Sequence, residues 1–407
     1  MIDLLKKSLN LGFGSLLGRI VGFFRYQVII VLIGINSTTD DVIFFYTMLW
    51  FSFSFVILPV MSGSLIADLN EIEDFEKVIS NYISEIIIYA ITILIISLVI
   101  KIGFNPPQLP AYDILLIIIF SLFLLGFNEA ISLYNQYMDR YFLYSINPLI
   151  WNTVMIMSTY FLYKINYFNT FGYLLLFSIS ILFSLVLQFK KSKLYILRIL
   201  KQINFRKIEL KPKYYQLTIV LFSSSLFIDF NLFKSVNNPG LISTYSLINK
   251  IPELLSSIVS GSLLVVIYND VIKDKIRVEK GFLKLTAINL LVFLGGGLVI
   301  YVYHDFIYGT LFNYNMYPHL NTLSMSFIFY FLFSTLSLII RLSYVNGLDK
   351  VFFFIISPLV LFKIAYFSFN QATIHSILLV NIILYLIISV LILMITFKPY
   401  VWNFNNN

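Results

Sequence analysis

The residues of this sequence whose types could do chemistry are ionisable side chains inside long apolar runs. Arg19 and Arg25 lie in the first run, and Lys250 and Glu253 lie three residues apart in a run of the second half. Ionisable groups in such runs are costly and usually face a cavity or a partner. Basic groups there can neutralise an anionic substrate, and a carboxylate three residues away can hold the lysine or accept sugar hydroxyls. These residues therefore indicate binding of an anion.

Each of these charges also has a structural interpretation. Arg19 can snorkel to a membrane surface, which suits it better than the deeper Arg25. Lys250 and Glu253 can neutralise each other, and Pro252 between them can kink the helix and free a backbone carbonyl. We favour a functional role for Arg25, and for the other three residues both roles stay open.

Two further ionisable residues lie well inside apolar runs of the second half, Asp229 and Lys363. A lone buried carboxylate would be protonated rather than ionised. We therefore predict that Asp229 and Lys363 form an intramembrane ion pair, or mark an ion site. Glu129 and Arg341, in equivalent runs of the two halves, are candidates to line the cytoplasmic half of a cavity, with snorkelling as the alternative for Arg341.

Three glycines share the first apolar run with the arginines. Gly14, Gly18 and Gly22 recur every four residues, so they lie on one face of a helix. Such a ridge lets another helix pack closely. Close packing is the role that we predict, and helix bending is the alternative.

The composition predicts which elements position these groups. Of 407 residues, 59% are hydrophobic and only 12% are charged, whereas about a quarter of the residues of soluble domains are charged. The apolar runs are long enough for membrane-spanning helices, which need about 20 residues each. We expect twelve spans, near residues 8–35, 41–67, 79–101, 112–137, 142–163, 170–189, 215–235, 240–268, 282–303, 320–346, 351–369 and 375–397.

The distribution of basic residues predicts the orientation in the membrane. A basic interval from Lys190 to Lys213 separates two sets of six expected spans and reads as a surface loop or an interfacial helix. Most other loop lysines and arginines fall on the same side of the membrane as this interval. The positive-inside rule then places both termini in the cytoplasm.

The two halves resemble each other in sequence. Asp139-Arg140 and Pro148-Leu149 recur, with the same spacing, as Asp349-Lys350 and Pro358-Leu359. Two sets of six spans indicate parallel repeats, with a substrate path between two lobes. The predicted fold is therefore an all-α polytopic bundle with an N-terminal lobe at 1–189, a basic linker at 190–213 and a C-terminal lobe at 214–407.

Motifs of catalysis and metal binding are missing from the sequence. It has no cysteine, and His304, His319 and His375 show no metal-ligand spacing. It has no Gly-rich phosphate loop, nucleophile elbow or paired-carboxylate motif. We expect no cofactor, no metal and no enzymatic activity.

Three motifs resemble the MurJ/MviN lipid II flippases of the MOP superfamily, which share the MATE-like fold. The first is the run from Gly18 to Arg25, followed by Gly34 and then by Thr39-Asp40. The second extends from Asn135 through Asp139-Arg140-Tyr141 to the segment 148–152. The third comprises Asp229 and the segment from Gly240 to Glu253.

The resemblance implies which residues contact the substrate. It puts Arg19, Arg25, Asp40, Lys250 and Glu253 at charged positions of the family's cavity, with Lys250 where the family usually has arginine. The lysine ammonium is a point charge, whereas the arginine guanidinium can donate two parallel hydrogen bonds to one diphosphate.

Two departures shift the expected substrate. The segment 51–58 lacks the family's charged residues, and the family has two more spans than the twelve expected here. In both respects the chain looks more like the O-antigen and capsule flippases of the same superfamily.

The charged residues and the resemblance together predict a flippase of the bacterial inner membrane. It would move an undecaprenyl-diphosphate-linked saccharide, either lipid II or a surface-polysaccharide repeat unit, from the inner to the outer leaflet. Its partners would be this lipid-linked oligosaccharide and membrane lipids, without nucleic acid, and coupling to Na⁺, H⁺ or the membrane potential is left open. The alternatives are a MATE-like cation antiporter, which would need acidic cavity groups, and a membrane glycan polymerase or ligase, which would need a large outer loop.

Overall fold

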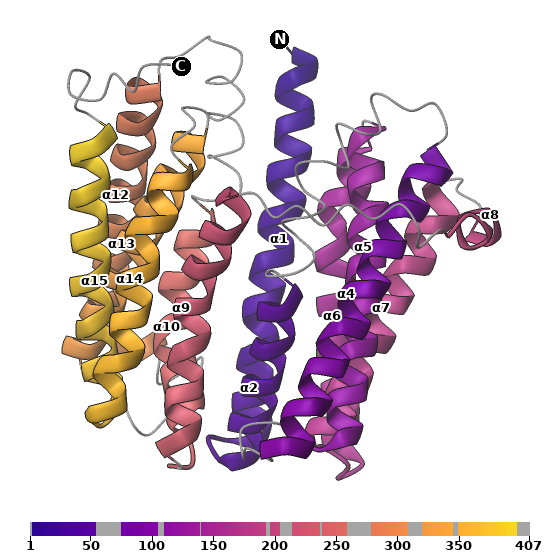
Figure 1. Cartoon of the computed structure of the whole chain (residues 1–407), viewed down its shortest axis with the longest axis horizontal. Coiled ribbons are helices and arrows are strands. Elements are labelled where there is room, and N and C mark those ends of the chain that lie inside the picture. Colours follow the sequence, from indigo (N-terminus) through magenta and orange to yellow (C-terminus); the bar gives the residue numbers. More distant parts are fainter. Residues whose placement is uncertain are drawn as a thin grey trace. The chain divides into compact units, whose positions relative to one another are not determined.

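The structure is a computed structural model, and it describes residues 2–53, 75–104, 110–138, 140–192, 196–203, 214–236, 238–258, 278–307, 320–344 and 349–396. Within these ranges all regular secondary structure is helical (Figure 1). The predicted all-α class is confirmed. The helices are α1 (Ile2–Ile33), α2 (Ser37–Ser52), α4 (Phe75–Phe104), α5 (Tyr112–Tyr137), α6 (Tyr141–Lys164), α7 (Thr170–Ser192), α8 (Ile196–Lys201), α9 (Tyr214–Val236), α10 (Leu241–Ile258), α12 (Val278–Val302), α13 (Leu320–Tyr344), α14 (Asp349–Phe369) and α15 (Ile374–Thr396).

The expected spans coincide with these helices. Ten of them match within a few residues at each end, except that α1 begins earlier than expected. The expected spans at 41–67 and 240–268 are represented by α2 and α10, and the rest of each lies outside the described residues. Seven helices in the described part of the chain are long and apolar enough to cross a membrane: α4, α5, α7, α12, α13, α14 and α15. The protein is thus a multi-pass membrane protein.

Side chains cap the first turns of α2 and α7, where lipid could not satisfy free backbone donors. Asn36 precedes α2, and its side chain accepts a hydrogen bond from the Thr39 amide at 3.1 Å. Asn169 does the same for the Gly172 amide of α7 at 2.7 Å. Gly34, with a φ of 85°, ends α1 in the left-handed conformation that favours glycine.

The chain divides into two compact units, residues 1–244 and 245–407, and each is described by itself. The boundary falls inside α10, so the first turn of this helix belongs to the first unit. The predicted lobes at 1–189 and 214–407 stay a prediction. Within the predicted linker, α8 buries Ile199 and exposes Arg198, whose Nη1 lies 3.9 Å from a Glu76 carboxylate oxygen of α4. The interfacial alternative for the linker stays a prediction.

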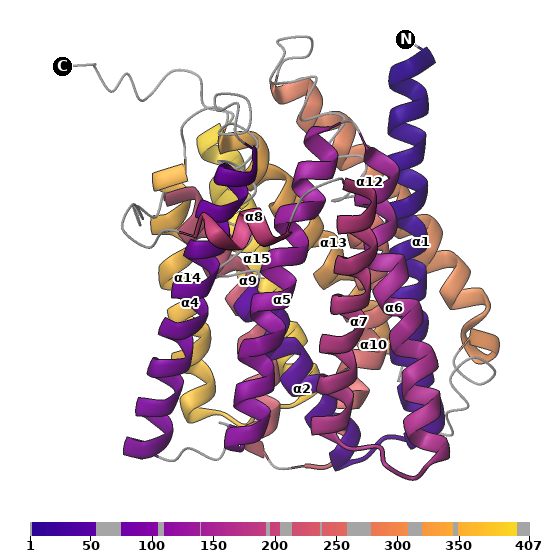
Figure 2. The ribbon, with the colours of Figure 1, turned by 90° about the vertical axis from the view of Figure 1, so that its right-hand side faces the viewer.

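In the first unit, α1 packs along α6 (Figure 2). A Cβ atom added at Gly18 would lie 3.0 Å from the Pro148 Cβ, and one at Gly22 would lie 3.2 Å from the Asn152 Nδ2. Asn152 in turn donates a hydrogen bond to the Gly18 carbonyl at 3.3 Å. The predicted close packing of the glycine ridge is confirmed.

A buried polar network holds α6 on its other side. The Asn147 amide donates to Ser132 of α5 at 2.8 Å, and Ser132 donates to Gln188 of α7 at 3.1 Å. Gln188 donates to Asn128 at 2.9 Å, and Ser184 donates to Asn147. These five side chains are at most 4% exposed. Helices α5, α6 and α7 are thereby bonded to one another, while α6 also supports α1.

In the second unit, polar pairs join α13 to its neighbours. Ser326 of α13 donates to Asn249 of α10 at 2.5 Å, and Asn289 of α12 donates to Thr335 of α13 at 2.9 Å. All four side chains are buried. Such pairs are the usual bonds between helices in lipid, where the hydrophobic effect does not drive association.

Candidate functional site

Arg25 is a buried cation in an aromatic box. It is 3% exposed, and its guanidinium carbon lies 4.2 Å from the ring centroid of Tyr46, 5.0 Å from that of Tyr26 and 5.4 Å from that of Trp151. The rings come from α1, α2 and α6, and α6 is held in place by the glycine ridge and the polar network. Desolvated cation–π contacts contribute about 2 kcal/mol or more, so the box fixes the guanidinium plane.

The guanidinium of Arg25 keeps donors for an anion. Its Nε and Nη1 atoms are buried and have no hydrogen-bond partner among the described residues. No carboxylate of the described part of the chain forms an ion pair with it. A guanidinium presents five N–H donors in a fork that fits phosphate or carboxylate oxygens. The arrangement suits an anion with several oxygens, such as a phosphate group.

One face of α2 is aromatic. Trp50 lies 6.1 Å from the Tyr46 ring and 5.8 Å from the Trp151 ring, so it extends the wall around Arg25. On another face, Phe51 stacks on Phe227 of α9 at 4.6 Å. The expected departure in segment 51–58 therefore corresponds, as far as Phe53, to aromatic packing. Residues 54–58 lie outside the described residues.

Arg19 lies on a different face of α1. The helix is continuous between the two arginines, so Arg19 and Arg25 are separated by about 9 Å along the axis and about 120° around it. Arg19 is partly exposed, in contrast to Arg25. The structure therefore does not put both guanidinium groups at one point, and the snorkelling alternative for Arg19 stays open.

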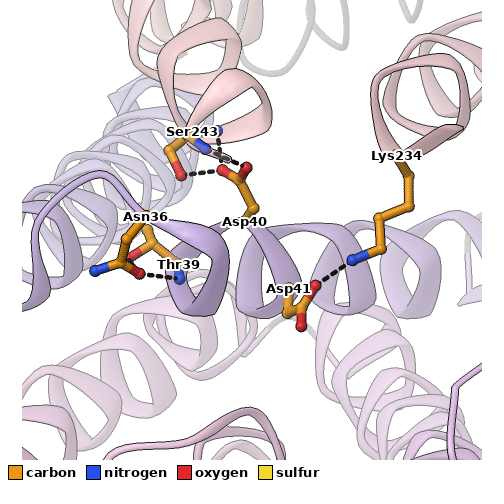
Figure 3. Close-up of polar contacts among 7 residues, drawn as sticks. Asn36, Thr39, Asp40, Asp41, Lys234 and Ser243 are labelled. Carbon is orange, nitrogen blue, oxygen red and sulfur yellow. Dashed lines mark hydrogen bonds and ion pairs between the residues drawn. The ribbon is translucent and has the colours of Figure 1, made fainter. Parts of the chain in front are cut away.

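Asp40 is the centre of a joint between two helix corners (Figure 3). Its carboxylate accepts hydrogen bonds from the Gly240 amide at 2.7 Å, from the Ser243 amide at 2.8 Å and from the Ser243 hydroxyl. Asp40 is 5% exposed, and it lies at the N-terminus of α10, where the helix dipole favours a negative charge. Asp40 thus caps α10 from α2, and its predicted substrate contact stays a prediction.

Two features tighten this joint. Gly240 has a φ of 88°, and a Cβ atom there would lie 2.7 Å from the Ile35 Cγ2 of the α1–α2 corner. Beside it, Lys234 of α9 donates to the Asp41 carboxylate (Figure 3). Sequence reasoning missed the joint, although the acid in the first turn of α2 and glycines at both corners were signals for it.

Lys250 and Glu253 form the predicted pair. The Lys250 Nζ lies 2.7 Å from the Glu253 Oε2, and both residues belong to the part of α10 in the second unit. The lysine side chain is 13% exposed and the carboxylate side chain 49%. Pro252 lies inside the helix between them, as expected for a kink. The predicted ion pair between Lys250 and Glu253 is confirmed. Their contact with a substrate stays a prediction.

Asp229 and Lys363 are both fully buried. Asp229 belongs to α9 in the first unit, and Lys363 belongs to α14 in the second, each 0% exposed. Their ion pair stays a prediction. Among the described residues no group of three or more His, Asp or Glu side chains could hold a metal ion. His304 lies 3.0 Å from the Asp305 carboxylate, and His319 lies outside the described residues.

No protein-family model matches the sequence, and no curated protein matches it. Solved structures do match the fold. The lipid II flippase MurJ in an inward closed conformation matches with a TM-score of 0.70 over 95% of this chain and 87% of that chain, at 17% sequence identity. An outward-facing multidrug-resistance MATE transporter of the MOP superfamily matches with a TM-score of 0.60 over 96% and 94% of the chains, at 13% identity. A point mutant of the Vibrio cholerae MATE transporter VcmN matches with a TM-score of 0.58 over 98% of each chain, at 13% identity.

The chain therefore has the fold of the MOP-superfamily transporters. The predicted fold class is confirmed by these matches as well as by the helices. At such low identity the likeness is one of fold, and it does not identify the substrate.

Proposed function

We propose that this protein is a flippase that moves a polyprenyl-diphosphate-linked saccharide from the inner to the outer leaflet of a bacterial cytoplasmic membrane. The observation that carries the proposal is Arg25, a buried guanidinium whose Nε and Nη1 donors have no hydrogen-bond partner among the described residues. A phosphate group satisfies such a fork with two parallel hydrogen bonds. The sequence motifs that resemble the lipid II flippases support the same substrate class, and the predicted partner is a lipid-linked oligosaccharide.

In the proposed cycle, basic groups neutralise the diphosphate while the cytoplasmic side is open. Arg25 binds first, Lys250 contributes a second charge that Glu253 orients, and Arg19 attracts the anion from the membrane surface. The lobes at 1–189 and 214–407, joined by the basic linker at 190–213, then rock to exchange access. The membrane potential can bias this cycle, because about 2.3 kcal/mol is available per charge per 100 mV.

Asp40 is proposed to contact the substrate, as the resemblance implies, in addition to capping α10 through the Gly240 and Ser243 amides. The buried Asp229 and Lys363 are proposed to neutralise each other, in place of a bound cation. A charge-swapped double variant that stays inactive while both single variants stay active would contradict this pairing.

The test is leaflet transfer in proteoliposomes with a labelled polyprenyl-diphosphate oligosaccharide. Arg25→Ala should abolish transfer, and Arg25→Lys should retain only part of it because a point charge replaces the fork. The control is Lys164→Gln, which removes an exposed cation 5.6 Å from the Tyr160 ring centroid. Transfer by Arg25→Ala at the wild-type rate would reject the proposal.

A second candidate is a multidrug antiporter, which the fold likeness to MATE transporters favours. An antiporter for organic cations needs a negative binding site, whereas the buried box of the first unit holds a positive charge. Wild-type protein that exports organic cations, and moves no lipid-linked saccharide in the same vesicles, would establish the antiporter instead.

A further inference from the structure

Trp50 is a partly exposed ring beside the aromatic box of Arg25. It follows Tyr46 by one turn of α2, so both side chains lie on the same face of this helix. Its ring centroid lies 6.1 Å from that of Tyr46 and 5.8 Å from that of Trp151, and both of these rings contact the Arg25 guanidinium. Tyr46 and Trp151 are at most 6% exposed. The indole of Trp50 is therefore one ring away from the guanidinium, and it is more accessible than the two rings between them.

The coverage of α2 decreases along the helix toward Trp50. Every residue from Val42 to Tyr46 is buried, whereas Leu49 is the only buried residue from 47 to 52. Helix α2 contacts α1, α5, α7 and α9 of the same unit. Its last turns are therefore the least covered part of a helix that lies among others.

The indole of Trp50 offers both a ring face and a hydrogen-bond donor. Its Nε1 atom forms no hydrogen bond with the described residues, although the N–H of a tryptophan in a protein interior usually has a partner. None of its neighbouring rings stacks parallel to it, since the interplanar angles are 65° with Tyr46, 37° with Trp151 and 85° with Phe53. The adjacent Phe51 differs, because its ring stacks at 6° on Phe227.

A pyranose ring matches this combination of groups. The C–H groups on a face of the sugar are apolar and slightly positive, so they pack on the negative face of an aromatic ring, and hydroxyl oxygens accept from an indole N–H. A hydrocarbon chain uses the ring face but leaves the N–H without an acceptor. In a sugar diphosphate the anomeric carbon is bonded to a phosphate oxygen. A diphosphate on Arg25 would therefore carry its first sugar beside the guanidinium, where Trp50 lies.

We propose that Trp50 determines specificity for the saccharide, by stacking on the pyranose ring linked to the diphosphate and donating a hydrogen bond to one of its hydroxyl oxygens. The inference rests on the proposed function, because Arg25 must hold the diphosphate for Trp50 to meet the sugar. A pyranose with equatorial hydroxyl groups, such as glucose, presents an uninterrupted C–H face to the indole. The protein should thus bind a glycosylated diphosphate more tightly than the bare diphosphate.

The experiment compares two probes, a short-chain prenyl diphosphate and the same diphosphate carrying one glucose unit. Calorimetric titration of the purified full-length protein in nanodiscs gives the dissociation constant of each. In Trp50→Ala the affinity for the glycosylated probe should fall by roughly 3- to 10-fold, while the affinity for the bare diphosphate should not change. Trp50→Phe should restore part of the difference, because it keeps a ring but lacks the N–H. The control is Phe51→Ala, which removes the neighbouring ring stacked on Phe227 and should keep the wild-type preference.

The two affinities separate a sugar contact from a structural role of Trp50. An equal loss for both probes in Trp50→Ala would overturn the inference, because a damaged fold or a lost lipid contact acts on both. A wild type without a preference for the glycosylated probe, or a Trp50→Ala that keeps the preference, would overturn it as well while the anion site at Arg25 stands. Binding of neither probe by the wild type, or undiminished binding of both by Arg25→Ala, would instead refute the proposed function and the inference with it.

Discussion

At the scale of single residues, the described charges fall into two groups according to whether the protein satisfies them. Asp40 accepts hydrogen bonds at the start of α10, and Asp41 pairs with Lys234 near the end of α9. Glu253 pairs with Lys250 on its own helix. Arg25 and Glu129 lie in the interior of the first unit without an ionic partner among the described residues. Buried charges without partners are costly, and proteins retain them at sites that act on ligands or ions. We therefore propose Arg25 as the group that binds the substrate.

Asp40 provides a prediction about the α10 cap. Asp40→Asn removes the charge from three hydrogen bonds at the α10 N-terminus, which should cost about 1–2 kcal/mol. Hydrogen exchange of the Gly240 and Ser243 amides, measured by mass spectrometry, should then accelerate by roughly 5- to 30-fold.

The matched control for this prediction is Asp41→Asn. It breaks a partly exposed ion pair with Lys234, which contributes only about 0.2–1 kcal/mol. Exchange at Gly240 and Ser243 should stay close to that of the wild type. Equal exchange in Asp40→Asn and the wild type would show that the carboxylate does not secure α10.

At the scale of elements, α6 positions part of the aromatic box around Arg25. It contacts the glycine ridge of α1 on one side and the Asn147 network of α5 and α7 on the other. Its Trp151 is one wall of the box around Arg25. A guanidinium on a mobile helix would lose its orientation, so the close α1–α6 contact is part of the site.

Gly18→Ala tests this contact. The added methyl group would lie 3.0 Å from the Pro148 Cβ and 3.2 Å from the Leu149 amide nitrogen, so the helices must separate. We expect a loss of about 1–3 kcal/mol, the usual cost of overpacking, and a lower thermal midpoint in detergent.

Gly295→Ala in α12 is the comparison for Gly18→Ala. A Cβ atom there meets nothing within 4 Å, so only the helix propensity changes. Its thermal midpoint should rise slightly, in line with a gain of about 0.5–1 kcal/mol. If both substitutions gave the same midpoint, the α1–α6 contact would be looser than the structure indicates.

At the scale of the whole molecule, the orientation in the membrane decides which leaflet supplies the substrate. The chain has no cysteine, so single cysteines can be introduced without background labelling. A cysteine at the exposed Lys164 should react with an impermeant maleimide in intact cells. One at the exposed Lys201 of α8 should react only after the membrane is opened. The reverse pattern would invert the proposed direction of transport.

Much of the architecture follows from the sequence because membrane helices satisfy their own backbone hydrogen bonds. The length and position of each apolar run therefore predict a helix with little help from tertiary contacts, as the agreement for α5, α6 and α13 shows. The ridge of Gly14, Gly18 and Gly22 and the pair of Lys250 and Glu253 were also predictable, since both depend on spacing along a single helix.

Only the tertiary structure decided the contacts between helices. The aromatic box around Arg25 consists in part of Tyr46 from α2 and Trp151 from α6. The Asp40 cap joins two helix corners that are about 200 residues apart in the chain. The sequence determined that the chain spans a membrane and carries costly charges in its spans. Because a helix has a regular period but no code for its neighbours, the partner of each charge depends on packing. Packing alone distinguished the bonded Asp40 from Arg25 and Glu129, which have no ionic partner among the described residues.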